Sequence, residues 1–276
     1  MMAMVLALGA AMAWGFADFK GGIASRQRAV LAVLVVSQAA GAVFMLALAA
    51  GFAGNISTTA VVAGIAGGVL GAGSIAAFYA ALAGGSMGVV APITATNAVL
   101  PVIVGFAAGE RPHPLQLAGL GVTAIGVVLA AREPGGGGHN HRRSVMLALV
   151  AAVLLGATLV MYHRGAESSM LWTITVGRLT SFAVLLGAAA VLRPSLRMGA
   201  RAAGGLAMVG ILDVGANALF AASATMGYLS VAGVLASLYP VVTVALARTR
   251  LHEHVSAPQQ AGVALSLSGL ALIGAG

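Results

Sequence analysis

Residues 88–101 read GVVAPITATNAVLP, and residues 227–240 read GYLSVAGVLASLYP. Each stretch runs from a glycine to a proline, and the second begins 139 residues after the first, about half the length of the 276-residue chain. The similarity continues downstream, because Glu110 and Glu253 are each followed by a glutamine, an alanine and two glycines at the same spacings. Two similar halves predict two structural repeats.

The composition predicts a membrane protein. Hydrophobic residues make up 60% of the chain and charged residues 7%, whereas a soluble domain has about 25% charged residues. Continuously apolar runs such as LAVLVVSQAAGAVFMLALAA (residues 31–50) favour helices over barrel strands. The chain has no cysteine, which excludes disulfides and thiolate metal sites. The net charge of +8 comes from residues in short loops, so we predict contacts with membrane lipids and no nucleic-acid partner.

Ten segments are long and apolar enough to cross about 30 Å of hydrocarbon. They are residues 3–24, 30–53, 59–82, 87–108, 115–131, 145–162, 169–192, 203–225, 229–247 and 258–275. The longest polar connection, REPGGGGHNHRR, lies at the midpoint of the chain. We therefore predict an all-α integral membrane protein with ten transmembrane helices. A first five-helix repeat (1–131) and a second (145–276) are joined by a linker (132–144).

The orientation follows from the number of helices and the loop charges. Because each half has an odd number of helices, the second repeat enters the membrane from the opposite side, so the repeats are inverted. Eleven of the 14 basic residues lie on one side, and only Arg111 and Arg164 lie in loops on the other. The positive-inside rule then predicts a multi-pass protein of the cell membrane, inner or plasma, with both termini outside.

The chain resembles the EamA type of the drug/metabolite transporter superfamily. The resemblance lies in the Trp14–Gly15 pair, in residues 77–130, from AFYAALAGG to GVVLA, and in their second copy, residues 216–274, from ANALF to LALIG. It implies ten helices in two EamA-like repeats and the transport of small metabolites, amino acids, nucleotide sugars or drugs. It also implies cytoplasmic termini, whereas the loop charges predict termini outside, and we follow the charges.

Two ionisable residues lie deep inside predicted helices. Arg178 lies about nine residues into the seventh segment and Asp213 near the middle of the eighth, where insertion scales assign each a cost of about 2.5–3.5 kcal/mol. Asn217 follows Asp213 by one helical turn and faces the same way. We predict a polar cluster of these three that contacts substrate or exchanges protons; a buried ion pair that braces two helices is the alternative. At the repeat offset Asp213 corresponds to Ser74, so the scaffold does not require the charge.

The first segment adds two candidates to this pathway. Asp18 is expected to line the cavity, whereas Lys20, two positions away, faces elsewhere and reaches towards the headgroups. Trp14 lies well inside the segment, which favours a cavity wall over an interfacial anchor.

Neutral polar residues within the segments complete the candidates, and each either bridges helices or contacts substrate. They are Gln38, Tyr79, Asn97 and Tyr239. Gly-x-x-x-Gly spacings at 64/68 and 67/71 predict a close-packing face, within the monomer or in a dimer. Glu110 and Glu253, just before the fifth and tenth segments, are expected to stabilise the N-termini of those helices.

These features predict a secondary-active transporter that moves a small metabolite or drug-like solute by alternating access of its two halves. We expect an exporter, as a monomer or homodimer, with Asp213 and secondarily Asp18 as proton acceptors for coupling to a gradient. We expect no catalytic residue, cofactor or metal, because the sequence has no nucleotide-binding or metal-ligand motif. A non-transporting assembly or receptor subunit and an intramembrane enzyme are the alternatives.

Overall fold

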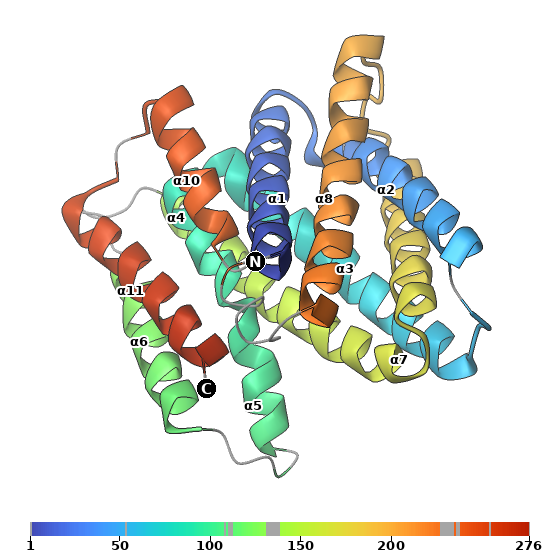
Figure 1. The fold of residues 1–276 in the computed structure, drawn as a ribbon. Helices are drawn as coiled ribbons and strands as arrows, with labels where there is room; N and C mark the ends of the chain where they lie inside the picture. Colours follow the sequence, from blue (N-terminus) through green and yellow to red (C-terminus); the bar gives the residue numbers. More distant parts are fainter. Residues whose placement is uncertain are drawn as a thin grey trace.

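The chain folds as a bundle of helices, with no strand in the part that the structure describes. The structure is a computed structural model that describes residues 2–52, 54–107, 109, 113–130, 139–226, 235, 238–253 and 255–275. Its elements are α1 (Met2–Gln27), α2 (Val30–Phe52), α3 (Thr58–Gly84), α4 (Met87–Thr94), the 3₁₀ turn η1 (Ala95–Ala98), α5 (Val99–Ala107), α6 (Pro114–Ala130), α7 (His139–Leu192), α8 (Ala200–Met226), α10 (Tyr239–Arg250) and α11 (Ala257–Ala275). In Figure 1, α1 runs upward from the N-terminus and α11 downward to the C-terminus, so both termini lie towards the same side of the bundle.

Six helical segments of the described chain are long and apolar enough to cross a membrane, by length and composition. They are Met2–Gln27, Val30–Phe52, Thr58–Gly84, Met87–Val104, Asn140–Leu192 and Ala200–Phe220. The prediction of an all-α protein with several membrane-spanning helices is confirmed, and the count of ten stays a prediction. The first part of the predicted segment 229–247, apart from residues 235 and 238, lies outside the described residues, and α10 begins at Tyr239.

The longest helix, α7, consists of two arms. Ser169 has an extended backbone (φ −164°, ψ 103°) in the middle of its 54 residues. A straight helix of that length would measure about 80 Å, more than twice the hydrocarbon thickness of about 30 Å. Figure 1 shows the first arm descending and the second rising beside it. The break at Ser169 therefore separates the two predicted helices 145–162 and 169–192.

The predicted segment 87–108 is interrupted near its middle. Pro92 lies inside α4, η1 follows, and Pro101 lies near the start of α5. Pro101 has no amide hydrogen to donate to the carbonyl of Asn97, four residues earlier. A Cβ on Gly156 of α7 would lie 2.6 Å from that carbonyl oxygen. The interruption is therefore packed against a neighbouring helix.

Glycines allow α3 and α7 to approach closely. A Cβ on Gly64 or Gly68 would collide with the backbone carbonyls of Thr173 and Gly177 in the second arm of α7. The predicted Gly-x-x-x-Gly face is thus confirmed as a packing face within one chain.

Glu253 stabilises a helix, but not the one that follows it. Its carboxylate accepts hydrogen bonds from the Ser86 hydroxyl (2.9 Å) and the Gly88 amide (3.3 Å) at the start of α4. It also forms an ion pair with Arg26, at 2.7 Å. The expectation that Glu253 serves the N-terminus of the last helix is therefore wrong, and the equivalent expectation for Glu110 lies outside the described residues. The sequence could not indicate this pairing, since Arg26 is far away along the chain.

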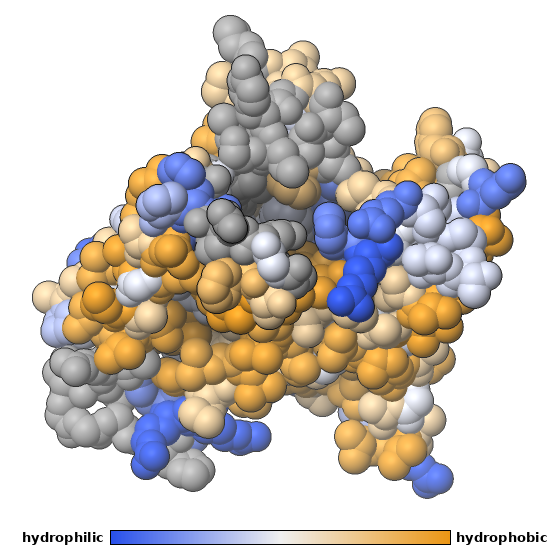
Figure 2. All heavy atoms as spheres, turned by 90° about the horizontal axis from the view of Figure 1, so that it is seen from below, coloured by the Kyte–Doolittle hydropathy of each residue, from blue (hydrophilic) through white to orange (hydrophobic). Residues whose placement is uncertain are grey.

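The outer surface is apolar over most of the helices. Large side chains such as Val43 (70% exposed) and Val191 (79% exposed) point away from the bundle. Figure 2 shows apolar residues over much of the described surface seen from below, with hydrophilic residues in separate patches. Soluble monomers rarely expose such continuous apolar surface, so the surrounding solvent is lipid.

Candidate functional site

An ion pair and a hydrogen bond join three helices in the interior. Arg178 Nη1 lies 2.5 Å from Asp213 Oδ2, which connects the second arm of α7 to α8. The same nitrogen donates to Gln38 Oε1 of α2 at 3.5 Å. The side chains of Arg178 and Asp213 are 17% and 29% exposed, respectively. The predicted proximity of Arg178 and Asp213 is confirmed, and Gln38 joins them.

Small residues bring α2 and α8 together beside this pair. A Cβ on Gly210 would collide with the carbonyl of Ser37, and a Cβ on Gly41 would lie 3.2 Å from the carbonyl oxygen of Gly210. Gln38 directly follows Ser37, and Asp213 lies about one turn after Gly210. The close backbone contact therefore sets the position of both polar side chains.

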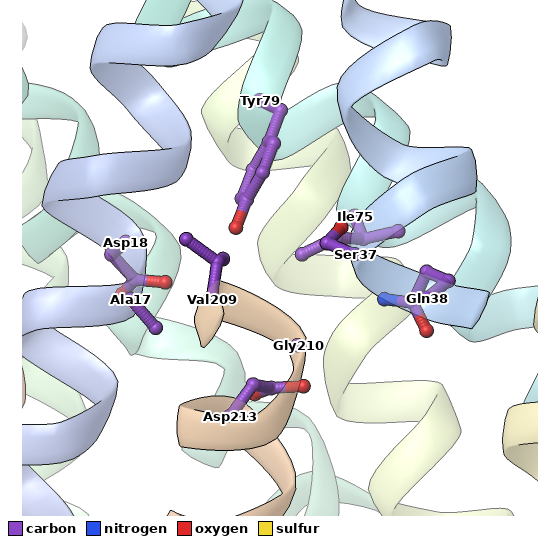
Figure 3. A pocket seen from close by; sticks show the side chains of 9 residues that line it. All are labelled: Ala17, Asp18, Ser37, Gln38, Ile75, Tyr79, Val209, Gly210 and Asp213. Atoms are coloured by element: carbon purple, nitrogen blue, oxygen red, sulfur yellow. The ribbon is translucent and has the colours of Figure 1, made fainter. Parts of the chain in front are cut away.

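A small cavity lies against these helices. It is lined by Ala17, Asp18, Ser37, Gln38, Ile75, Tyr79, Val209, Gly210 and Asp213. Figure 3 shows the Asp18 carboxylate and the Tyr79 hydroxyl pointing into the space between α1, α3 and α8, above Asp213. The volume open to the centre of a water molecule is about 20 Å³, which holds about one water. In this conformation the space between these polar side chains is too small for a metabolite.

Asp18 differs from Asp213 in its partners. The ion pairs among the described residues are Arg26–Glu253 and Arg178–Asp213, and Asp18 takes part in neither. Lys20 is only two positions away but points to another face of α1, as the helical geometry predicts. The cavity thus holds one paired and one unpaired carboxyl group. We call Asp18, Gln38, Tyr79, Arg178 and Asp213 the ionic centre.

Three aromatic rings gather next to the ionic centre. The Trp14 ring centroid lies 6.2 Å from that of Phe220 and 6.1 Å from that of Tyr239. Trp14 precedes Asp18 by one turn on α1, which rises in Figure 1, and Phe220 follows Asp213 by about two turns on α8, which descends. These rings, the aromatic cluster, therefore lie between the ionic centre and the side that carries the termini.

The two asparagines, Asn97 and Asn217, donate hydrogen bonds to backbone carbonyls, and Asn97 also contacts a neighbouring helix. Asn97 interacts with the Tyr239 side chain and donates to the Thr94 carbonyl at 3.1 Å, so it links η1 to α10. Asn217 Nδ2 donates to the backbone carbonyl of Asp213 at 2.6 Å. Its amide thus lies beside the ionic centre but bonds to its own helix rather than to the Asp213 carboxylate.

Sequence reasoning missed two aromatic residues at the site. Phe220 had a usable signal, because positions 213, 217 and 220 share one helical face. Tyr162 had none: it lies at the end of a predicted segment and reaches the site because α7 folds back. A Cβ on Gly177, next to Arg178, would collide with the Tyr162 hydroxyl. Within the described residues, no group of three or more His, Asp or Glu side chains could hold a metal ion.

The fold and the site define a multi-pass helical membrane protein with an ionic centre between its helices. The sequence model of the EamA-like transporter family matches residues 1–132 and again residues 142–275. The chain therefore belongs to the EamA-like transporter family, within the drug/metabolite transporter superfamily, and its relatives in that family are membrane transporters of small solutes.

Similarity to individual proteins is more distant. A solved structure described only as "Crystal structure of protein" has a TM-score of 0.66 and 17% sequence identity, and the match covers 98% of this chain and 95% of that one. At this identity the similarity establishes a shared fold and nothing more. No curated protein matches the chain.

Proposed function

We propose that this protein exports a small solute that carries a positive charge, in exchange for protons, by alternating access of two inverted repeats. The observation that carries the proposal is the charge arrangement of the ionic centre. Two carboxyl groups, Asp18 and Asp213, line one small cavity, and the guanidinium of Arg178 pairs with the second. Helices of both halves of the chain contribute to it.

The ionic centre has one more carboxyl group than it has cations. A charge inside hydrocarbon costs about 2.5–3.5 kcal/mol on insertion scales, and Arg178 offsets only the charge of Asp213. A proton or the ammonium group of a solute would neutralise Asp18. An anionic solute would add a third negative group to the same cavity, which makes a cation the better fit.

Competition between a proton and the solute for the carboxyl group of Asp18 would couple the movement of protons to the movement of the solute. If Asp18 holds either a proton or the solute, each conformational cycle that carries a proton inward returns with the solute outward. A proton gradient directed into the cell then drives export. Asp213 has a different part in this scheme. It stays paired with Arg178 and keeps the guanidinium of Arg178 in place beside Gln38.

Reciprocal glycine contacts support the inverted repeats. Gly119 and Gly126 of α6 occupy the positions of Gly262 and Gly269 in the second copy. A Cβ on Gly119 would collide with Gly269, and a Cβ on Gly126 with Gly262. Gly119 thus touches the counterpart of Gly126, and Gly126 touches the counterpart of Gly119, which is the pattern of a two-fold axis. The order of these contacts makes α6 and α11 antiparallel. We propose ten helices divided at 1–131 and 145–276.

A second set of contacts follows the same relation. A Cβ on Gly15 of α1 would meet the Tyr239 carbonyl and Val242, and a Cβ on Gly156 of α7 would meet the Asn97 carbonyl and Leu100. At the offset of the two quoted stretches Leu100 corresponds to Tyr239. The first and sixth predicted helices thus each pack through a glycine against the proline-containing helix of the other repeat, at positions that differ by about one turn.

The ion pair between Arg26 and Glu253 suggests which side is closed. Arg26 ends α1 and also donates to the carbonyls of Leu82 (3.1 Å) and Gly85 (2.7 Å), where α3 ends. Glu253 lies between α10 and α11, so the pair ties the two halves together at the side opposite to the termini. We propose that this pair opens when the protein admits solute from the cytoplasm, and that the aromatic cluster closes the path to the other side.

The orientation is tested with cysteines, because the natural chain has none. Asn55 and Ser195 are exposed and lie in connections on opposite sides. With basic loops in the cytoplasm, an impermeant thiol reagent should label Asn55→Cys in intact cells and Ser195→Cys only after lysis. The reverse pattern would place the termini in the cytoplasm.

The solute class is tested by a thermal-shift screen of the purified protein. A ligand present at 100 times its Kd stabilises the folded state by about 2.7 kcal/mol. We expect small amines to raise the melting temperature of the natural protein and not that of Asp18→Asn, which folds but lacks the negative charge. Stabilisation by carboxylates or phosphates alone, or equal stabilisation of both proteins, would contradict the proposal.

A further inference from the structure

A groove of about 330 Å³ lies on the outer side of the bundle, between α1 and the end of α10. The two helices run side by side in Figure 1 and contact one another. The residues that matter in it are the apolar Phe16, Phe19, Ile23 and Leu246 and the basic Lys20 and Arg250. The groove is separate from the ionic centre, because Asp18 and Lys20 point to different faces of α1.

The apolar part of the groove continues the face that α1 presents to lipid. Leu8, Met12 and Phe16 are 43%, 53% and 39% exposed and follow one another at intervals of one turn. The next position on this stripe is Lys20, which is also exposed. An occupant of the groove therefore touches hydrocarbon along α1 and meets a cation where the stripe ends.

Within the described part of the chain, the two basic residues have no acidic partner, unlike their neighbour Arg26. Arg26, one to two turns after Lys20, is held by Glu253. No acidic side chain of the described residues pairs with Lys20 or Arg250. Both lie towards the side of the basic loops, where the long side chains of lysine and arginine reach the level of lipid phosphates. A guanidinium and an ammonium across a groove form a suitable site for a phosphate group.

We propose that this groove binds one anionic phospholipid of the leaflet that faces the basic loops. Its phosphate lies between Lys20 and Arg250, and one acyl chain follows Phe16 and Leu246 along the groove. The apolar lining below the two cations is the reason to choose a lipid over a dissolved anion, because a dissolved anion would leave that lining uncovered. The proposal is independent of the transported solute and of the coupling ion.

The experiment compares lipids with the same acyl chains on the full-length protein by native mass spectrometry. We expect phosphatidylglycerol to remain bound about thirtyfold better than phosphatidylcholine, which corresponds to about 1 kcal/mol for each of two basic residues. The double variant Lys20→Gln/Arg250→Gln should lose this preference. The matched control Arg197→Gln/Arg201→Gln removes two exposed basic residues outside the groove and should keep it.

Three outcomes would overturn the proposal. Equal retention of the two lipids by the natural protein would show that the groove does not select an anion. Equal loss in the groove variant and the control would show a general effect of basic residues. Displacement of phosphatidylglycerol by inorganic phosphate or glycerol phosphate would show a site for a dissolved anion. Melting curves of both variants establish that they are folded, because all four substituted side chains are exposed.

Discussion

The two copies of the repeated sequence share glycines where α6 meets α11, but they differ at the ionic centre. At the α6–α11 contact both copies keep glycine, and Gly119 and Gly126 meet Gly269 and Gly262. At the ionic centre Asp213 corresponds to Ser74 in the other copy, and Ser74 only donates to the Ala151 carbonyl at 3.0 Å. Packing thus follows the repeat, whereas charge departs from it. The departures mark the residues that the scaffold alone does not explain.

The largest difference between these regions should appear when the ion pair loses one partner. Asp213→Ala leaves Arg178 as an uncompensated cation, which we expect to lower the free energy of unfolding by about 3 kcal/mol. This is the lower end of the range for a broken buried pair, because the Asp213 side chain is 29% exposed. Reversible unfolding in detergent measures the effect.

Two further variants complete that measurement. Asp213→Leu combined with Arg178→Met should restore most of the lost stability, since removing both charges leaves none unpaired. Ser74→Ala, at the corresponding position of the other copy, should cost only about 1 kcal/mol for one hydrogen bond. An Asp213→Ala protein as stable as the natural one would mean that the pair contributes nothing to the fold.

Side chains added at the α6–α11 contact test its two-fold character. Gly119→Val places a side chain against the backbone of Gly269, and we expect a loss of about 2 kcal/mol, within the range for overpacking. Gly262→Val, the counterpart in the second copy, should cost the same within about 0.5 kcal/mol. The control is Gly121→Val, because a Cβ at Gly121 meets nothing within 4 Å. Unequal losses at Gly119 and Gly262 would contradict a symmetric contact.

The smallest predicted effect concerns the Arg26–Glu253 ion pair. Its side chains are 29% and 13% exposed, so its contribution is about 1 kcal/mol or less. Glu253→Gln should therefore raise the rate at which a thiol reagent added from the side of the basic loops reaches Ser37→Cys by about fivefold. Ser37 is buried beside the cavity. An unchanged rate would show that this pair does not control access to the ionic centre.

The sequence predicted the parts of this molecule that depend on hydrophobic patterning and on the cost of charge. Helices, the packing glycines of α3 and the contact between Arg178 and Asp213 follow from these two principles. The contact between Arg178 and Asp213 could be expected because an opposite charge offsets the cost of a charge inside hydrocarbon.

Other features depend on how distant segments meet. Tyr162 reaches the ionic centre because α7 folds back at Ser169, and Glu253 binds Arg26 and the start of α4 rather than its own helix. Neither contact has a local pattern. The sequence favoured Asp213 over Asp18 as the proton acceptor. We place Asp18 first, because Arg178 pairs with Asp213 and no ion pair among the described residues includes Asp18.

The most direct test of the account counts the protons released when a solute binds. The experiment uses an amine found in the thermal-shift screen and the purified protein in weak buffer. Binding to the natural protein should release about one proton, because the solute replaces it on Asp18, and Asp18→Glu should behave in the same way. Asp18→Asn should release none and should lose proton-driven export in proteoliposomes. Proton release from Asp18→Asn equal to that of the natural protein would contradict the assignment of Asp18 as the shared site.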